Sequence, residues 1–323
     1  MDRTVTKTPP PKTTCSQDKH GRWHVILMKL NRSKGLYIFL LPAAVYFLVF
    51  NYFPMYGVQI AFKDFSPVLG ITGSPWIGFD HFERFFHSYY FTRLLRNTLC
   101  LSLYSLLVSF PIPVILALAF NEIGSEKMKK TVQTISYAPH FISIVVMVGV
   151  LNLFFSQSNG LINKILVDLG MEKIPFLTSS SNFPHMYVWS GIWQNTGWNA
   201  IIYIAAISGI DQQLYEAATV DGAGRFQRMW HITVPGLIPT FCVLLLMSIA
   251  NILSNGMDQY LVFENATNQN AIMVLDLYVY KLGIGKGAIP LSTVIGMVKS
   301  IVSVTLLFAA NGVSKLIRGE SIV

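Results

Sequence analysis

Residues 208–235 read SGIDQQLYEAATVDGAGRFQRMWHITVP and lie between two long apolar stretches. The segment is too polar to cross a membrane and too regularly patterned to be a simple linker. Asp211 occupies the N-cap position of a predicted helix. The residues that share one face of this helix are Leu214, Ala217, Ala218 and Asp221. Gly222 and Gly224 then let the backbone stop and turn, because glycine tolerates the left-handed conformation. The pattern predicts a short exposed helix followed by a turn.

A second short helix is predicted after the turn, from Arg225 to about Thr233, and Pro235 opens the next apolar stretch. The residues on its apolar side are Phe226, Met229 and Trp230. Together the two helices form a segment that leaves the membrane, turns and is fixed back onto it. The plainer alternative is an amphipathic loop that serves only to connect two spans.

The composition of the whole chain agrees with a membrane protein. Hydrophobic residues make up 52% of its 323 residues and charged residues 12%, about half the charged share of an ordinary globular protein. A soluble chain of this composition could not cover its surface with polar groups. The 22 Phe, 14 Tyr and 6 Trp residues, with a mean hydropathy of +0.48, also exclude a disordered chain and a basic nucleic-acid-binding protein.

Six stretches have the length of about 20 mainly apolar residues that a spanning helix needs. They cover approximately residues 36–58, 98–120, 135–155, 186–208, 237–257 and 291–313. The sequence therefore predicts an all-α membrane protein with six transmembrane helices. An even number of spans places both termini on the same side.

The distribution of basic residues predicts which side that is. Eight Lys and Arg residues precede the first apolar stretch, and the side that carries the termini has 15 in all against 8 on the other side. Because cytoplasmic loops are enriched in Lys and Arg, we expect cytoplasmic termini in a multi-pass protein of the cytoplasmic (inner) membrane. Arg93 and Arg96, near the outer end of the second span, run against this rule locally.

The two ends of the chain are predicted to lie outside the spans. Residues 1–35 read as a cytoplasmic tail that includes an interfacial elbow helix over residues 22–31. Residues 36–318 form the transmembrane domain, and 319–323 a cytoplasmic C-terminus. No signal peptide is expected.

Cofactors are not expected in this chain. Its cysteines, Cys15, Cys100 and Cys242, are odd in number and lack metal-type spacing, which predicts neither a disulfide nor a metal site. The chain also lacks the Gly-rich string, ending in Lys and Ser or Thr, with which P-loop proteins bind ATP.

Lys299 stands near the middle of the sixth apolar stretch. A charge at the centre of a membrane helix costs upward of ~2.5 kcal/mol, so it is a candidate for the permeation path. The alternatives are pairing with an acid on another helix, such as Asp258, and snorkelling.

Two further groups of polar and aromatic residues are candidates for contact with a permeating solute. In the fourth span these are Trp189, Trp193, Asn195, Trp198 and Asn199, since aromatic faces and amides suit sugar rings. Interfacial anchoring is the alternative for the tryptophans. At the end of the fifth span they are Asn251, Asn255, Asp258 and Gln259, which would form a polar stripe.

Asp258 and His140 do not by themselves indicate an enzyme, because a hydrolytic site needs several converging groups.

The segment 208–235 resembles the EAA loop of permease subunits of ATP-binding-cassette (ABC) importers. The matching residues are Glu216-Ala217-Ala218, two further residues, Asp221-Gly222-Ala223, eight further residues, and Ile232-Thr233-Val234-Pro235. Val234 stands where leucine is usual, and Met229-Trp230 replaces the common Phe. Neither departure changes the chemistry of the loop.

Other segments resemble the carbohydrate branch of that family, in particular the large permeases of oligosaccharide and uronic-acid polysaccharide importers. They are residues 137–143, 159–163, 198–199, 274–280 and 310–311, so the resemblance covers most of residues 36–318.

The resemblance implies the type I ABC importer permease fold, in which the loop helix is a coupling helix that sits in a groove of an ATPase. The residues carried over to this role are Leu214, Glu216, Ala217, Ala218, Asp221, Gly222, Ala223 and Arg225. Implied partners are a second permease subunit, two ATPase subunits that bind ATP and magnesium, and an extracytoplasmic solute-binding protein. The chain itself would be a transport subunit, not an enzyme.

The resemblance also implies the cargo, namely oligosaccharides or polysaccharide fragments, and it favours acidic ones such as alginate or pectin pieces. Two alternatives stay open. One is an ABC permease for a neutral sugar or another small solute. The other is a secondary transporter driven by an ion gradient, which should carry paired ionisable residues at mid-membrane.

Overall fold

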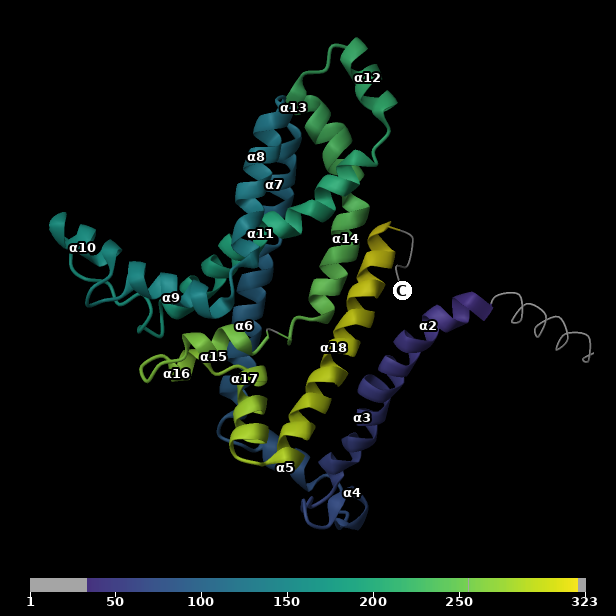
Figure 1. The fold of residues 1–323 in the computed structure, drawn as a ribbon, viewed down its shortest axis with the longest axis vertical. Helices are drawn as coiled ribbons and strands as arrows, with labels where there is room; N and C mark the ends of the chain where they lie inside the picture. Colours follow the sequence, from purple (N-terminus) through teal and green to yellow (C-terminus); the bar gives the residue numbers. More distant parts are fainter. Residues whose placement is uncertain (1–33, 255, 319–323) are drawn as a thin grey trace, which may run out of the picture. The chain divides into compact units, whose positions relative to one another are not determined.

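Helices form almost all the regular structure of the protein (Figure 1). The computed structural model describes residues 34–254 and 256–318. Within them no strand occurs, and an isolated bridge pairs Lys63 with Trp76. The chain divides into two units, Met1–Val58 (unit 1) and Gln59–Val323 (unit 2). The predicted elbow helix over residues 22–31 and Cys15 lie outside the described residues.

Unit 1 contains one long apolar helix. It comprises α2 (Lys34–Phe47), a π-helical turn (Leu48–Tyr52) and α3 (Phe53–Met55), and its helical path runs on to Phe62. None of its described residues in unit 1 is buried, which suits a helix whose surroundings are themselves apolar. The expected first span, 36–58, is therefore helical, and Pro42 lies inside it without ending it.

Unit 2 begins with short helices and then a long one. The short helices are a 3₁₀ turn that ends at Phe62, α4 (Gly70–Gly73) and α5 (Asp80–Phe86). Next, α6 (Phe91–Ser109) and α7 (Pro111–Asn121) join through Phe110, whose backbone is also helical. The result is a continuous helix of 31 residues that starts earlier than the predicted span 98–120.

The expected third span, 135–155, is not one straight helix. It consists of α8 (Glu126–Tyr137) with a 3₁₀ turn (Ala138–Phe141), and α9 (Ile144–Phe155), which meet at 101°. Ile142 is extended, and the Ser143 hydroxyl accepts a bond from the Val146 N–H at 3.3 Å, which caps α9. A proline turn followed by a new N-cap therefore bends this segment.

The remaining helices complete unit 2. They are α10 (Leu161–Asp168), α11 (Phe183–Ser208), α12 (Gln212–Val220), α13 (Arg225–Arg228), a π-helical turn (Met229–Thr233), α14 (Val234–Ala250), α15 (Asp258–Phe263), α16 (Gln269–Ile272), α17 (Leu275–Tyr280), a π-helical turn (Lys281–Gly285) and α18 (Ile289–Arg318). The helix that contains α14 ends at Ala250, earlier than the predicted limit of 257.

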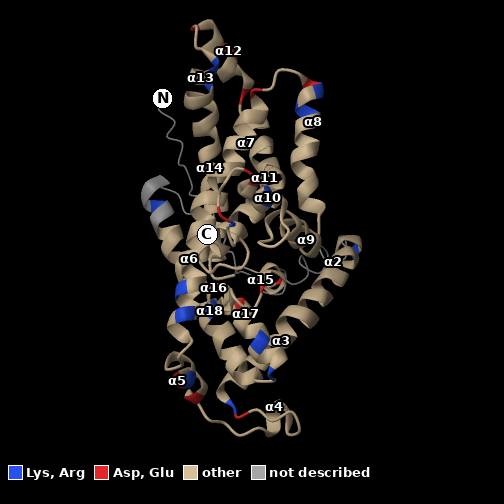
Figure 2. Ribbon diagram, turned by 90° about the vertical axis from the view of Figure 1, so that its left-hand side faces the viewer, with Lys and Arg blue, Asp and Glu red and all other residues tan. Residues whose placement is uncertain are grey.

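In the described ranges, four helices are long and apolar enough to cross a membrane, or five if the bent pair is one span. The predicted fourth span coincides with α11, whose 26 residues are long enough. Gln194, Asn195 and Asn199 lower the mean hydropathy of α11. Figure 2 shows Lys and Arg near α8, α12, α13 and α5, whereas the stretches labelled α7 and α14 carry few.

Helix α11 lies at the centre of the packing in unit 2. Its first half joins a core cluster with residues of α6, α9 and the segment 260–277, and Tyr187 stacks on Tyr260 with ring centres 4.4 Å apart. Its second half packs Ala200 and Tyr203 against α7 and α14. Gly197 permits a backbone contact with α8, because a Cβ there would lie 2.0 Å from the Ser136 carbonyl oxygen. A third core cluster joins α5, α6, α17 and α18.

Candidate functional site

Helix α12 is a short helix with a defined beginning and end. The Asp211 carboxylate accepts a bond from the Gln213 N–H at 3.0 Å, as expected of an N-cap. At the other end the Gly222 N–H donates to Thr219 O at 3.1 Å and the Ala223 N–H donates to Ala218 O at 2.8 Å. This is a Schellman cap, and Gly222 has the left-handed backbone that it requires, with φ of +80°.

Gly224 does not share that conformation. Its φ is −67° and its backbone is extended, so the prediction of a left-handed Gly224 is wrong. It serves as the N-cap of α13, and its N–H donates to the Gln227 side-chain oxygen at 2.8 Å. One left-handed residue is enough to reverse the chain here, because the Schellman cap already turns the backbone.

Side-chain interactions join α12 to the rest of the loop and join the loop to the end of α7. Tyr215 of α12 bonds the Thr233 hydroxyl at 2.9 Å, and Arg228 of α13 donates to the Thr219 hydroxyl at 2.7 Å. Arg225 reaches the end of α7, where its Nε lies 3.4 Å from a Glu122 carboxylate oxygen and its Nη2 donates to the Glu122 carbonyl at 3.3 Å. Motion of α12 is thereby linked to both α7 and α14.

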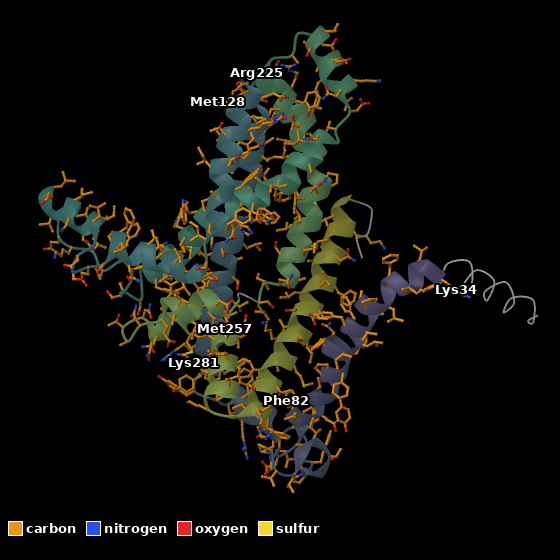
Figure 3. All side chains as sticks on the ribbon, viewed as in Figure 1. Lys34, Phe82, Met128, Arg225, Met257 and Lys281 are labelled. Carbon is orange, nitrogen blue, oxygen red and sulfur yellow. The ribbon has the colours of Figure 1, made fainter. Side chains whose placement is uncertain are left out.

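The surface of this loop is largely exposed and partly apolar. No residue of α12 is buried. Four large side chains of the segment are exposed by half or more: Leu214 (52%), Val220 (87%), Phe226 (82%) and Trp230 (65%). Figure 3 places Arg225 and Met128 at the same end of unit 2. Exposed apolar residues clustered at the end of a membrane protein, beside polar groups, mark a contact surface for another protein.

The residues implied to couple with an ATPase lie together in this loop. Those with exposed side chains or backbone are Leu214, Glu216, Ala217, Asp221, Gly222 and Arg225, and those half-buried are Ala218 and Ala223. The two half-buried residues hold the Schellman cap, so the exposed ones remain available to a partner.

A second candidate site is a group of three small cavities lined by residues of α6, α11, α14 and α15 and of the segments next to them. Their volumes are about 250, 270 and 310 Å³. Asn199 lines all three, and its side chain is exposed. Amides and hydroxyls supply the other polar groups of the lining, from Ser105, Ser109, Asn195, Thr196, Ser248, Asn251 and Gln259. We call this set the amide surface.

The structure holds several of these amides in place. The Asn195 side-chain oxygen accepts a hydrogen bond from His140 Nδ1 at 3.0 Å, and the Asn195 side-chain nitrogen donates to Gly191 O at 3.1 Å. Gln259 donates to the Ser190 hydroxyl at 3.2 Å. Asn251 follows the last residue of α14 and donates back to Met247 O at 2.9 Å. Oriented amides of this kind can exchange hydrogen bonds with the hydroxyl groups of a solute.

The tryptophans of the predicted pathway lie elsewhere. Trp189 and Trp193 are 54% and 51% exposed, and neither lines the amide surface. Trp198 stacks on the His140 ring, with centres 4.6 Å apart and planes at 7°. Spacing along a helix identifies a face but not its neighbour. Trp189 and Trp193 therefore lie away from the cavities, whereas Trp198 and Asn195 both contact His140.

The charged candidates of the predicted pathway also separate from the amide surface. Lys299 on α18 forms an ion pair with Asp276 on α17, and not with Asp258. Asp258 is exposed at the start of α15. A second pair joins Lys281 to Glu264 nearby. Asn255 lies outside the described residues.

Some residues of the amide surface are absent from the sequence prediction. They are the residues with hydroxyl groups, Ser105, Ser109, Thr196 and Ser248. Ser105 and Ser109 are four residues apart on one helical face, and that spacing in an apolar stretch is the signal that could have identified them.

Comparison with known proteins places the chain in a family. Residues 102–318 match the family described as "Binding-protein-dependent transport system inner membrane component". The Bacillus subtilis (strain 168) "Polygalacturonan/rhamnogalacturonan transport system permease protein YteP" is 43% identical over 297 residues, which cover 92% of each protein.

Two solved structures have the same fold. The crystal structure of a bacterial ABC transporter involved in the import of the acidic polysaccharide alginate matches with a TM-score of 0.83 and 40% identity, over 91% of this chain and 99% of that chain. A bacterial alginate ABC transporter in complex with an alginate pentasaccharide-bound periplasmic protein matches with a TM-score of 0.83 and 38% identity, over the same shares. This chain therefore belongs to the family of inner-membrane components of binding-protein-dependent transport systems.

Proposed function

We propose that this chain and a second, homologous permease form the membrane pathway of an ATP-driven importer of acidic oligosaccharides. As a member of its family, the chain is a multi-pass transport subunit of the inner membrane and not an enzyme. The observation that carries the proposal is α12, a capped helix with no buried residue, in a loop whose side chains bond the end of α7 and the turn that precedes α14.

The α12 loop is the proposed point of contact with an ATPase. Leu214, Val220 and Phe226 offer apolar surface to a groove, and Glu216 and Asp221 flank it with charge. The proposed partners are two ATPase subunits, which bind the ATP and magnesium that this chain does not. Movement of the ATPase subunits would be transmitted through α12 as a rigid-body rotation between two states of alternating access.

This arrangement requires α12 on the cytoplasmic side. The same topology places both termini there, as the Lys and Arg count predicts. It also places α5, at the opposite end of unit 2 from α12 (Figure 1), on the outer side. A solute-binding protein would deliver the cargo to that end, as the periplasmic protein does in the alginate transporter complex.

The proposed cargo follows from the relatives. YteP is named for polygalacturonan and rhamnogalacturonan, and both structures belong to importers of alginate. These polymers share uronate units, each with one carboxylate. The amide surface, with Asn195, Asn199, Asn251 and Gln259, would exchange hydrogen bonds with the sugar hydroxyls along the pathway.

Reconstituted import tests this function. We expect the complete importer in proteoliposomes to accumulate trigalacturonate only when the binding protein and hydrolysable ATP are both present, with ATP on the α12 side. A non-hydrolysable ATP analogue is the control and should give no accumulation. Accumulation driven by an ion gradient without ATP would identify a secondary transporter and refute the proposal. Import of neutral trisaccharides alone would refute the acidic cargo.

A further inference from the structure

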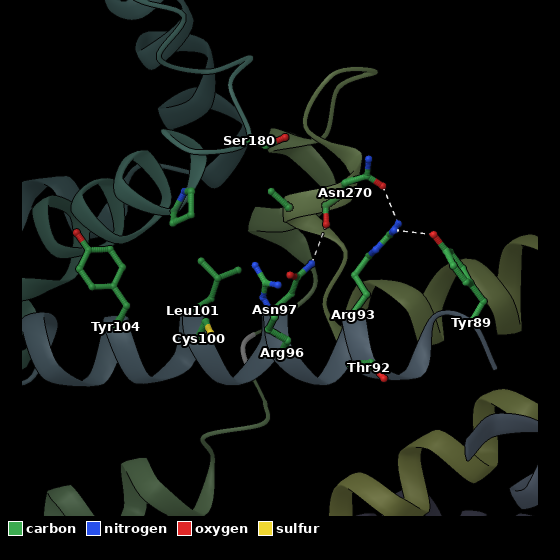
Figure 4. A pocket seen from close by; sticks show the side chains of 12 residues that line it. Tyr89, Thr92, Arg93, Arg96, Asn97, Cys100, Leu101, Tyr104, Ser180 and Asn270 are labelled. Atoms are coloured by element: carbon green, nitrogen blue, oxygen red, sulfur yellow. Dashed lines mark hydrogen bonds between the residues drawn. The ribbon is translucent and has the colours of Figure 1, made fainter. Parts of the chain in front are cut away.

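A further cavity of unit 2 is lined mainly by α6. Its volume is about 740 Å³, which is within the range of about 300–1,000 Å³ for ligand pockets. The α6 residues that line it include Arg93, Arg96, Asn97 and Tyr104, which share one face of the helix. Segments around residues 180–184 and 270–271 form the opposite wall (Figure 4). We call it the arginine cavity.

The lining of the arginine cavity is positively charged. Arg93 and Arg96 contribute two guanidinium groups, and no Asp or Glu is among the lining residues. This differs from the two ion pairs of the same unit, Lys299 with Asp276 and Lys281 with Glu264, in which the charges are compensated. The positive charge of the cavity is therefore available to an anion that enters from solvent.

Arg93 is held in a fixed orientation. Its Nη1 donates to the Asn270 side-chain oxygen at 2.8 Å and its Nη2 donates to the Tyr89 hydroxyl at 3.1 Å, as Figure 4 shows. Its guanidinium carbon lies 5.3 Å from the centre of the Tyr89 ring. Asn97, one turn further along α6, donates to the Asn270 carbonyl at 2.8 Å. Hydrogen bonds therefore hold the wall in place at Arg93 and Asn97.

Arg96 differs from Arg93 because its side chain is exposed. An exposed guanidinium next to a fixed one provides donors for a planar anion, and the fork geometry of arginine matches a carboxylate. Tyr104, whose hydroxyl bonds His185 at 2.9 Å, adds an ordered aromatic ring to the same face of α6. Aromatic rings next to hydrogen-bonding groups suit a sugar ring.

The position of the two arginines supports a functional interpretation. In the proposed topology they lie in the outer half of unit 2, where Lys and Arg are disfavoured. Their positive potential would attract an anion that arrives from outside before it reaches the uncharged amide surface. A solely structural role would not require Arg96, which is exposed.

We propose that the arginine cavity receives the carboxylate of an acidic sugar on the outer side, with Arg96 as the direct ligand and Arg93 as its fixed neighbour. The proposal rests on the proposed function, because it names the group that recognises the acidic cargo. The same guanidinium pair could hold the phosphate of a lipid headgroup, which is an anion of similar geometry. The experiment must therefore separate sugar from lipid.

Direct binding to the assembled permease and ATPase complex in nanodiscs, without the binding protein, tests this site. The probes are trigalacturonate and its fully methyl-esterified form, which has the same size but no charge. We expect Arg96→Gln to weaken binding of trigalacturonate about tenfold relative to binding of the ester, the loss of one charge-assisted contact. Arg96→Lys, which keeps the charge, should recover part of that preference.

Arg84→Gln is the matched control, because Arg84 is an exposed arginine paired with Asp80 on α5 and is outside the cavity. It should leave the preference for trigalacturonate unchanged. The lipid source is tested with nanodiscs of phosphatidylcholine alone and with phosphatidylglycerol added. If phosphatidylglycerol abolishes trigalacturonate binding to the wild type, the cavity is a lipid site and the proposal is wrong.

Two further outcomes would overturn the proposal. One is equal binding of both probes by the wild type, and the other is an unchanged preference in Arg96→Gln. If the wild-type complex, reconstituted in proteoliposomes with the binding protein and ATP, still imports trigalacturonate, only the arginine cavity is refuted. If the complex imports no trigalacturonate, both the proposed function and this inference are refuted.

Discussion

Gly222→Val is expected to lower ATP-driven import roughly tenfold or more, while the chain still inserts and assembles. Gly222 has a φ of +80° and ends α12. A left-handed conformation costs an L-residue roughly 1–2 kcal/mol, and a β-branched residue is the least tolerant of it. No atom lies within 4 Å of a Cβ built at Gly222, so the cost is purely conformational. The expected consequence is loss of the Schellman cap and of the position of α12.

Two variants make this prediction specific. Gly222→Asn should retain more import than Gly222→Val, because asparagine tolerates the left-handed region. Gly170→Val introduces the same strain at φ of +79°, also without a steric clash, but after α10 and outside the loop. It should leave coupling intact. The measurements are substrate-stimulated ATPase activity and import, both at matched amounts of complex. Full import and full ATPase activity of Gly222→Val would disprove the coupling role.

Lys299→Met is expected to destabilise the assembled permease by roughly 3 kcal/mol. The Lys299 and Asp276 side chains are only 19% and 17% exposed. Removal of the lysine leaves a largely buried carboxylate without a partner, and the desolvation of that charge is no longer offset. The midpoint of thermal unfolding of the purified complex should therefore fall.

The double variant Lys299→Met with Asp276→Leu should recover most of the lost midpoint, because it removes both charges. Lys130→Met is the matched control, since the Lys130 and Glu126 side chains are 80% and 89% exposed and 3.9 Å apart. An exposed pair of this kind contributes little, so its removal should not move the midpoint. If the double variant recovers the midpoint but not the import of acidic sugar, Lys299 also acts in the pathway.

The loop 208–235 could be predicted in detail because its geometry is local. Asp211 caps the helix that follows it, and Gly222 turns the chain through hydrogen bonds within six residues. Each of these contacts depends on residues that are close in sequence. Gly224 was predicted incorrectly because two nearby glycines offered two places for one turn.

The bend between α8 and α9 is a local feature that the mean hydropathy of a long stretch does not reveal. Residues 135–155 are mainly apolar when averaged over the whole stretch, so the stretch suggests one span. The two local signals were nevertheless present, namely Pro139 in a 3₁₀ turn and Ser143 at an N-cap. Their effect is a 101° change of direction.

The pathway could be predicted only in part because helix periodicity does not select a neighbour. The sequence groups Asn195 and Asn199 with Trp189 and Trp193 as polar and aromatic residues of one span, yet only the two amides line the cavities. The partner of Lys299 was equally undetermined, because Asp276 lies 23 residues away on another helix. Tertiary packing determines which residues line the cavities and which acid pairs with Lys299.

Cross-linking of α12 to the ATPase tests the central claim, that this loop links the permease to ATP hydrolysis. A photoreactive maleimide is attached to Leu214→Cys in α12 and, as a control, to Met171→Cys after α10. The two native side chains are 52% and 51% exposed, so both positions should be labelled equally. We predict an adduct with the ATPase from position 214 only, in membranes that contain the whole complex. Equal labelling without an ATPase adduct from position 214 would contradict both the coupling role and the cytoplasmic location of α12.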